Sequence, residues 1–411
     1  MVIRDPIHGD LFFTEAERRL MDTPQMQRLR GIRQTGTAHF VYPGCVHTRF
    51  EHSLGTTAMA RRILGSIKQN GWEISSDQET IVALAALVHD VSHLPFGHTF
   101  EDERRLFPRH DSVERLTAFL SQKELGCAIE ASGFREDLIG LLTDPLFDPP
   151  WMRQIISSTV DADLLDYLRR DAYFAGLKQD YDDRILSHFT VEDENLTIDA
   201  RKLSTRTELL HLLRLRYFLT ERVYTHHAKL ISGAMIAKAV ELSVMQGLTE
   251  ADLYELTDDC LLKSLSKNDD HRISSLANGV VHRKLLKRAY VLSESEIGRK
   301  GRDELIGTYH RSTEARASKE KEIANAAALE SHKVILYCPD VSFIKEARVF
   351  VRTEDGLRRL NEPTDSPPFD IKALEDQYER LWRFYVFAPE GHQDRVVNVC
   401  EKSIGERNAR F

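Results

Sequence analysis

Helical periodicity dominates the first 290 residues of the chain. Apolar residues recur at the spacing of one helix face in the segments 52–70, 78–92, 112–121, 151–175 and 204–245. A helix is also expected to begin in TEAERRL, because Thr14 and Glu17 stand at capping-box spacing. Another is expected in DTPQMQRLRGIRQTG, where Pro24 suits a first helical position and Gly36 follows the end. This part of the chain is therefore predicted to be mainly α-helical.

Strand-like patterns interrupt the helices once and return near the C-terminus. Residues 188–200, HFTVEDENLTIDA, alternate apolar and polar positions around a Glu-Asn turn, which predicts a hairpin. A charged helix in 312–331, whose charge run is most simply a solvated face, precedes strand-like KVILYCP and EARVFVRT. A Pro-rich loop at 361–369 and strand-like LWRFYVFAP follow. The predicted fold is mainly α, with a helical core over residues 1–300 and a small α+β lobe over 301–411.

The charge balance bears on which partners the protein binds. The 411 residues include 56 Lys and Arg against 64 Asp and Glu, a formal net charge of −8. A protein dedicated to duplex nucleic acid is usually basic, so a nucleic-acid partner is not favoured. A local basic pocket for a small polyanion remains compatible with this balance.

Cysteine spacing and the apolar runs point to a cytoplasmic protein. The five cysteines are far apart and form no C-x-x-C pair, which is typical of scattered buried thiols in a reducing compartment. The start, MVIRDPIHGD, has no apolar signal-peptide core. The most apolar run, TIVALAALVHDV, is shorter than the roughly 20 residues that a membrane span needs. We expect no membrane partner.

The stretch LVHDVSHLPFGHTFE places several ionisable groups at the end of an apolar helix. His89 and Asp90 follow the continuously apolar IVALAAL, and a buried carboxylate beside an imidazole needs a partner. Pro95 is expected to end this helix, and Gly97 to let the chain turn. His52, at the start of another amphipathic helix, would by itself more often be structural than catalytic.

A further set of polar residues lies in DADLLDYLRRDAYFAG. Asp163, Tyr167 and Asp171 are spaced i, i+4, i+8 and line one helix face, which could run from a metal towards a sugar. The alternative is a solvated charge network, because Asp166 and Arg170 are in the same segment.

Together these histidines and aspartates form a set of metal-ligand types. The order His…His-Asp…Asp on three helices supplies two imidazoles and two carboxylates. Such a mixed set suits a six-coordinate Fe, Mn, Ni or Mg ion with open positions, and Zn less ideally. A metal with open positions can polarise a phosphoryl oxygen and lower the pKa of a bound water.

This order resembles the HD-domain metal-dependent phosphohydrolase superfamily. Within it, the chain is similar to deoxynucleoside triphosphate triphosphohydrolases, namely the SAM-and-HD-domain-containing dNTPase and bacterial dGTPases. The resemblance rests on DPIHG, DTPQMQRLR, HTRFEHSLG, HDVSHLPFGHTFE, RHDSVERL, DYLRRD, VILYCP and YERLWRFYVF, which occur in the family's order. It implies an HD-domain helical bundle and covers nearly the whole chain. It also implies that the metal ligands are His52, His89, Asp90 and Asp163.

The resemblance further implies an active site built for a triphosphate. Arg49 matches an arginine that holds phosphate, and His93 and His110 match histidines that contact it, His110 being a candidate general acid. His98 matches the histidine that assists water attack at the α-phosphorus. Glu101, three residues later, is expected to orient and charge-stabilise that imidazole.

The nucleoside is expected to contact a second group of residues. Gln34, Tyr167 and Asp171 match residues that surround the deoxyribose, where a tyrosine under C2′ would exclude a 2′-hydroxyl. Arg216 and Tyr224 match a phosphate contact and a sugar or base contact.

An activating nucleotide, GTP or a dNTP bound between subunits, is a further implication. Asp22, Gln27 and Arg30 match residues that read guanine in the eukaryotic enzyme, a homo-oligomer, so a dimer, tetramer or hexamer is expected. The chain departs from that pattern at Met1, where a lysine would be expected, and at Arg4, which replaces an asparagine. The residues that match the guanine contacts are therefore present, whereas the positions that match the phosphate contacts are changed.

The leading hypothesis is a metal-dependent enzyme that hydrolyses dNTP, with dGTP one candidate, to deoxynucleoside and inorganic tripolyphosphate. It is compatible with nucleotide-pool control and with antiphage defence. One alternative is an HD-family nuclease or phosphodiesterase acting on single-stranded nucleic acid or another nucleotide. Another is a nucleotide sensor that binds without turnover, although pure binding needs no water-activating histidine. The sequence leaves the base and the metal (Mn, Fe, Mg, Ni or Zn) open.

Overall fold

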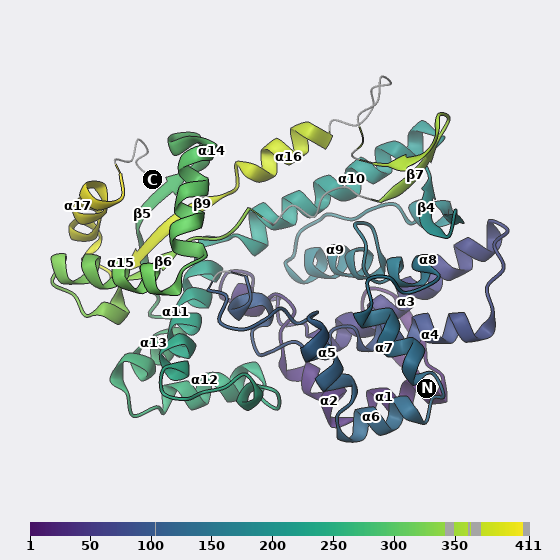
Figure 1. Cartoon of the computed structure of the whole chain (residues 1–411), viewed down its shortest axis with the longest axis horizontal. Helices are drawn as coiled ribbons and strands as arrows, with labels where there is room; N and C mark the ends of the chain where they lie inside the picture. Colours follow the sequence, from purple (N-terminus) through teal and green to yellow (C-terminus); the bar gives the residue numbers. More distant parts are fainter. Residues whose placement is uncertain (103, 342–348, 361, 363–370, 406–411) are drawn as a thin grey trace.

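Helices dominate the computed structural model, which describes residues 1–102, 104–341, 349–360, 362 and 371–405 (Figure 1). The helices up to residue 174 are α1 (Glu15–Met21), α2 (Pro24–Arg28), α3 (Arg49–Gln69), α4 (Ser76–Val88), α5 (Val113–Leu120), α6 (Lys123–Glu130), α7 (Arg135–Thr143), α8 (Pro150–Gln154) and α9 (Ala162–Phe174). The later helices are α10 (Leu203–Leu219), the π-helical turn η5 (Thr220–Tyr224), α11 (His227–Val244), α12 (Asp258–Ser266), α13 (His271–Val281), α14 (Glu294–Leu305), α15 (Thr313–Ala326), α16 (Ile371–Glu379) and α17 (Gln393–Ser403). The predicted mainly α fold with an α+β C-terminal region is confirmed.

Three small sheets complete the described chain. The strands are β1 (Val2–Asp5), β2 (Gly9–Phe12), β3 (Phe189–Glu192), β4 (Asn195–Asp199), β5 (Lys287–Ser293), β6 (Ile335–Tyr337), β7 (Phe350–Thr353), β8 (Gly356–Arg359) and β9 (Arg383–Ala388). Strands β1 and β2 pair with each other, the second sheet has the order β3-β4-β7-β8, and the third has the order β5-β9-β6. The hairpin expected at 188–200 is β3–β4, and its β4 edge pairs in parallel with β7.

The sheets connect parts of the chain that are distant in sequence. Strand β5 precedes residue 300 yet pairs with β9, so the C-terminal sheet takes one strand from before the predicted boundary. The division at 300 stays a prediction. Figure 1 shows α1–α9 on one side, β5, β6 and β9 with α14, α15 and α17 on the other, and α10 crossing between them.

Helix α3 organises the part of the fold that carries the expected ligands. It packs against α4 and α9. Its start is defined locally, because Thr48 and Glu51 form a capping box around the first turn. The same device, with Thr14 and Glu17, starts α1 as predicted.

Two helices end earlier than their sequence pattern predicts. Helix α2 stops at Arg28, well before Gly36, and Arg28 turns inward to donate to main-chain carbonyls of the loop after α4. Helix α4 stops at Val88 with His89 as its C-cap, so Pro95 is not what ends it. At the end of α2, these long-range hydrogen bonds of Arg28 accompany the early stop.

The segment 151–175 is two helices instead of one. Asp161 separates α8 from α9 by accepting the N–H groups of Ser158 and Leu164 at 2.7 and 2.8 Å. Asp161 is therefore the N-cap of α9, and Asp163 lies in the first turn of that helix.

The charge run of α15 is not simply a solvated face. Arg316 and Glu320 are buried, and Glu320 pairs with the buried Arg104 and Lys238. Arg316 also donates to the main-chain carbonyl of Arg104 at 3.2 Å. The α15 charges therefore attach the C-terminal lobe to Arg104 and to Lys238 of α11.

Three remaining expectations have mixed outcomes. All five cysteines are free, but Cys127 and Cys260 are exposed rather than buried. The expected Pro-rich loop at 361–369 lies outside the described residues except for Glu362, as does the start of EARVFVRT. Among the described helices, none has both the length and the apolarity needed to cross a membrane.

Candidate active site

Three helices bring the expected metal ligands together. His52 comes from α3, His89 from the end of α4 and Asp163 from the first turn of α9, and one ligand atom of each lies within 4.8 Å of the others. His52 Nε2 is 2.9 Å from Asp163 Oδ1 and 3.8 Å from Asp90 Oδ2. His89 Nε2 is 3.4 Å from Asp90 Oδ1. All four predicted ligands thus face one small volume.

The orientation of the two imidazoles fits a metal. His52 Nδ1 lies 2.7 Å from Asp166 Oδ2, and His89 Nδ1 lies 2.8 Å from the carbonyl of Ala86. With Nδ1 held from behind, each ring presents Nε2 to the shared volume, as metal-binding histidines usually do. His89 Nε2 is buried and makes no hydrogen bond within the described residues. A divalent cation would satisfy this nitrogen, so the residues present fit the ion that the ligand set implies.

Asp166 is a supporting residue whose role the sequence pattern did not identify. Its carboxylate contacts His52, lies 2.6 Å from His8 Nε2, and accepts two hydrogen bonds from Arg170. Arg170 also donates to Asp5 at 2.9 Å. Burial alone would raise the pKa of Asp166, but Arg170 and the two imidazoles hold it well below its ordinary value. The alternative of a solvated network is wrong for Asp166 and Arg170, both of which are buried.

Arg49 lies directly beside the ligand set. Its Nη1 is 2.6 Å from Asp90 Oδ2, and both side chains are buried. Gly97, with φ of 59°, makes room for this guanidinium, because a Cβ at that position would be 2.7 Å from Arg49 Nη2. The arrangement places a fixed positive charge next to the metal position.

The expected catalytic histidines form a second cluster. His93 and His110 stack with ring centroids 3.7 Å apart, and His98 lies 4.8 Å from His93. Glu101 Oε2 is 3.2 Å from His98 Nδ1 and 3.1 Å from His110 Nδ1. The sequence predicted Glu101 as the partner of His98, and the structure places both imidazoles on the same carboxylate oxygen. Arg115 Nη1 donates to the other carboxylate oxygen, Glu101 Oε1, at 2.8 Å.

Several of the side chains expected around the sugar contact one another through hydrogen bonds and aromatic packing. Asp171 accepts from the Tyr224 hydroxyl at 2.6 Å and lies 2.7 Å from His47 Nε2, a partner that the sequence reasoning missed. Tyr167 and Tyr224 meet edge to face with centroids 6.5 Å apart. Gln34 Oε1 is buried without a hydrogen-bond partner in the described chain. This group therefore has an ordered, aromatic framework.

Arg216 lies near the same tyrosines. Among the described residues it forms no ion pair, and its side chain is half-buried on α10. An unpaired, half-buried guanidinium suits an anionic ligand. Its position is consistent with the expected phosphate contact.

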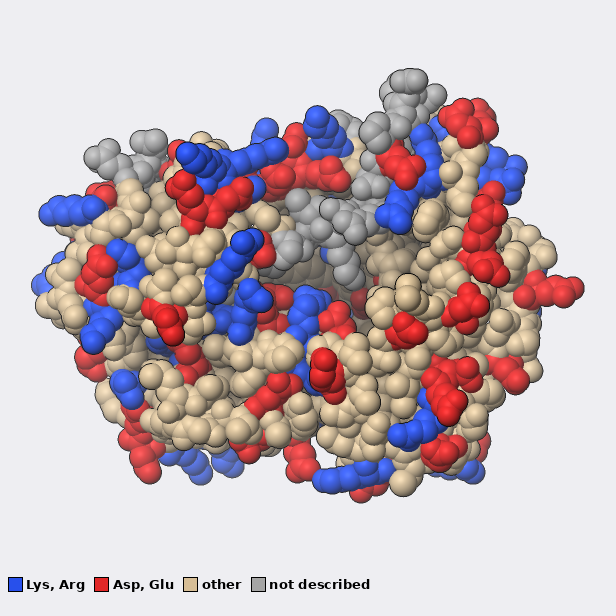
Figure 2. All heavy atoms as spheres, in the orientation of Figure 1, with Lys and Arg blue, Asp and Glu red and all other residues tan. Residues whose placement is uncertain are grey.

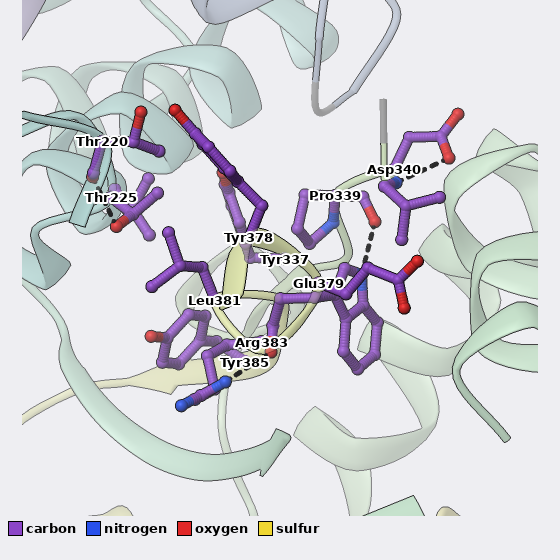
Figure 3. Close-up of a pocket in the computed structure, with 13 residues that line it drawn as sticks. Thr220, Thr225, Tyr337, Pro339, Asp340, Tyr378, Glu379, Leu381, Arg383 and Tyr385 are labelled. Carbon is purple, nitrogen blue, oxygen red and sulfur yellow. Dashed lines mark hydrogen bonds between the residues drawn. The ribbon is translucent and has the colours of Figure 1, made fainter. Parts of the chain in front are cut away.

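A small cavity lies between the turn after α10 and the C-terminal lobe (Figure 3). Tyr378 and Tyr385 line it, and Trp382 donates from Nε1 to the carbonyl of Pro339 at 2.8 Å. None of its lining residues is an expected metal ligand, so this cavity is not the candidate centre. Its Thr220 belongs to the same η5 turn as the expected sugar contact.

The residues expected to read an activating guanine lie together at the surface. Gln27 donates to the carbonyl of Met21, next to Asp22, and accepts from Arg30 Nε at 2.8 Å. The Arg30 guanidinium is 3.8 Å from the centroid of the Phe50 ring. Asp22 and Arg30 are exposed.

Two buried groups that the sequence reasoning missed hold the loop between Asp90 and Gly97. Arg28 donates to the carbonyls of Val91 and His93 at 3.0 and 2.6 Å. Asp258, on α12, accepts the N–H of Phe96 at 2.6 Å. Only the fold reveals these roles, because Arg28 is 63 positions from Val91 and Asp258 is 162 positions from Phe96.

Asp258 gives a pH prediction. Burial raises the pKa of its carboxyl from 3.8 to about 6. Between these values the folded state binds more protons than the unfolded state, so the stability falls as pH rises. We expect Asp258 to reduce the free energy of unfolding by about 2 kcal/mol between pH 4 and pH 7. Denaturant unfolding across this range should show that Asp258→Asn loses this slope. Asp259→Asn, an adjacent exposed change that removes only the smallest of the contributions to this shift, should keep most of the slope, and equal slopes in all three proteins would contradict the prediction.

Two protein-family models match the chain. The HD domain matches residues 49–171, and the HD associated region matches residues 180–408. An uncharacterized protein of Methanocaldococcus jannaschii is 27% identical over 420 residues, which cover 99% of this chain and 82% of that protein. The deoxynucleoside triphosphate triphosphohydrolase SAMHD1 of Homo sapiens is 26% identical over 463 residues, covering 99% and 71%. The SAMHD1 homolog of Dictyostelium discoideum is 31% identical over 276 residues, covering 63% of this chain and 51% of that protein.

Solved structures share the fold. A phosphohydrolase from Bacteroides thetaiotaomicron superposes with a TM-score of 0.73 at 22% identity, covering 95% of this chain and 100% of that one. A hypothetical protein from Aquifex aeolicus gives 0.70 at 22% identity, covering 97% and 99%.

Proposed function

Because the chain belongs to the HD-domain phosphohydrolases that carry an HD associated region, we propose that it hydrolyses dNTP to deoxynucleoside and inorganic tripolyphosphate. The observation that carries this proposal is the convergence of His52, His89, Asp90 and Asp163 beside Arg49. The relatives named as deoxynucleoside triphosphate triphosphohydrolases support the choice of substrate.

The proposed mechanism gives the two histidine clusters different tasks. The cluster with His52 and His89 would hold the metal, and the cluster with His98 and His110 would transfer protons. A divalent ion held by the four ligands would polarise a phosphoryl oxygen and acidify a bound water. Arg49 and Arg216 would neutralise the triphosphate charge, which grows in the transition state. His98 would take a proton from the attacking water while Glu101 stabilises the imidazolium. His110 would donate a proton to the departing 5′-oxygen of the deoxynucleoside.

The proposed pocket also accounts for the sugar. Tyr167 under C2′ would leave no room for a 2′-hydroxyl, and the Asp171–Tyr224 pair would hold the 3′ side. We also propose that a second nucleotide binds at Asp22, Gln27 and Arg30 between subunits of a homo-oligomer.

Product analysis tests the proposal. Each of the four dNTPs is incubated with protein loaded with Mn²⁺, Mg²⁺ or Fe²⁺, with and without GTP or a second dNTP. We expect stoichiometric deoxynucleoside and tripolyphosphate, activity lost on chelation and restored by metal. No tripolyphosphate from any dNTP under all these conditions would make the proposal wrong. Metal-dependent cleavage of labelled single-stranded DNA or RNA instead would favour the nuclease alternative.

The surface agrees with a small substrate better than with a long polyanion. On the face drawn in Figure 2, Lys and Arg alternate with Asp and Glu rather than forming a continuous basic track. Extended nucleic-acid sites usually need such a track.

A further inference from the structure

A separate group of potential metal ligands lies outside the active site. His271 is the first residue of α13, whereas Glu330 and His332 flank and enter the short 3₁₀ turn η8 (Ser331–Lys333) that precedes β6. One ligand atom of each lies within 4.8 Å of the others. We propose that His271, Glu330 and His332 form a second divalent-metal site, of the kind that takes Zn²⁺, Co²⁺ or Ni²⁺.

His332 is the observation that carries the proposal. Its side chain is 2% exposed, and its Nδ1 is buried without a hydrogen-bond partner in the described chain. Its Nε2 lies 3.1 Å from the Ser275 hydroxyl of α13, which fixes the ring. A metal-binding imidazole commonly has its second nitrogen held in this way. A buried nitrogen with no partner is unfavourable, and an ion would satisfy it.

The spacing of the donors also fits an ion. His332 Nδ1 and Glu330 Oε2 are 3.6 Å apart, too long for a hydrogen bond. Two tetrahedral ligands at about 2.1 Å from Zn²⁺ lie about 3.4 Å apart. The rings of His271 and His332 are edge to face with centroids 6.0 Å apart, so a nitrogen of the exposed His271 can complete the set.

The local charges keep the donors in their binding forms. Burial lowers the pKa of His332, which favours the neutral imidazole that binds a metal. Lys333 donates to Glu330 Oε1 at 2.7 Å and lowers the pKa of that carboxyl, which leaves Oε2 for the ion. The neighbouring Arg272 is paired with Asp270 at 2.6 Å.

A metal here would join two parts of the fold. His271 belongs to α13, whereas Glu330 and His332 lead into β6 of the C-terminal sheet, and α13 packs on η8. Because the donors are about 60 residues apart, only the folded chain presents them together. Binding would therefore raise the thermal midpoint with metal concentration.

Metal counting on the full chain tests the site. Zn²⁺ stoichiometry is measured by equilibrium dialysis, and Co²⁺ coordination by its visible absorption. We expect two ions in the wild type and one in His271→Ala, whose exposed side chain can be removed without loss of the fold. His282→Ala, an exposed histidine at the other end of α13, should keep both.

A second background separates the two metal sites. In His89→Ala/Asp163→Ala the active-site ion should be absent and one ion should remain. Adding His271→Ala to this double variant should remove the remaining ion and, with it, the Zn²⁺-dependent rise in thermal midpoint. Glu330→Gln should weaken binding in the same background. Equal metal content with and without His271, or equal loss in His282→Ala, would overturn the proposal.

Discussion

Replacing Asp163 with alanine is expected to slow dNTP hydrolysis by about 10³-fold or more while the protein stays folded. The carboxylate is 2.9 Å from His52 Nε2 and 3.9 Å from His89 Nε2, so it contributes directly to the proposed metal set. Metal coordination supplies several kcal/mol of transition-state stabilisation, and about 4 kcal/mol corresponds to about 10³-fold in rate. Its side chain is 26% exposed, so its removal opens no buried cavity. Tripolyphosphate release, bound metal and the thermal midpoint are measured together.

Asp77→Ala is the matched control for this variant. Asp163 is the second residue of α9 and Asp77 is the second residue of α4, so both substitutions remove an acid from a helix N-terminus. Each should cost about 0.3–1 kcal/mol of stability through the helix dipole. Only Asp163→Ala should lose metal and activity. An Asp163→Ala protein that keeps its metal and turns over within about tenfold of the wild-type rate would contradict the assignment.

Replacing Gly55 with alanine is expected to lower the free energy of unfolding by at least about 3 kcal/mol. A Cβ at this position in α3 would overlap Asp166 Oδ1 and Arg170 Nη2 of α9. Both side chains are fully buried and paired with each other, so neither can move into solvent without breaking a buried ion pair. Because Asp166 also orients His52, the metal affinity should fall as well.

Gly65→Ala separates this packing effect from helix propensity. Gly65 is in the same helix, and a Cβ there meets no atom within 4 Å. Alanine is about 1 kcal/mol more favourable than glycine inside a helix, so this variant should be neutral or more stable than wild type. Thermal and denaturant unfolding measure the stability of both variants. Similar stabilities for the two would rule out the close approach of α3 and α9 as the cause of destabilisation.

The order of the sequence motifs predicted most of the candidate-site residues, but it did not predict the residues that support them. His52, His89, Asp90 and Asp163 were expected from the sequence, and the structure brings them together. His8, which contacts Asp166 across 158 positions, carried no such signal, since one histidine in a short hairpin could contact many groups. The DPIHG motif that contains His8 was the available clue, but spacing alone does not identify the partner.

Local interactions explain what was predictable from the chain alone. The capping boxes at Thr14 and Thr48 involve residues three positions apart. Such features depend on neighbouring residues, so they can be inferred without knowing the fold. The order of metal-ligand types is likewise a property of the chain.

Which charged side chains are buried depends on contacts between segments that are distant in sequence. On α9, Arg169 is 14% exposed and pairs with Asp180 and Asp183, which lie at the surface, whereas Arg170 of the same helix is fully buried. On α15, Glu320 is buried because Arg104, 216 positions away, meets it. A charged side chain enters the core only where an opposite charge compensates its desolvation, and that partner comes from another part of the fold. The ligand types could therefore be identified from the chain, but the residues that support them, and the burial of those residues, required the packed structure.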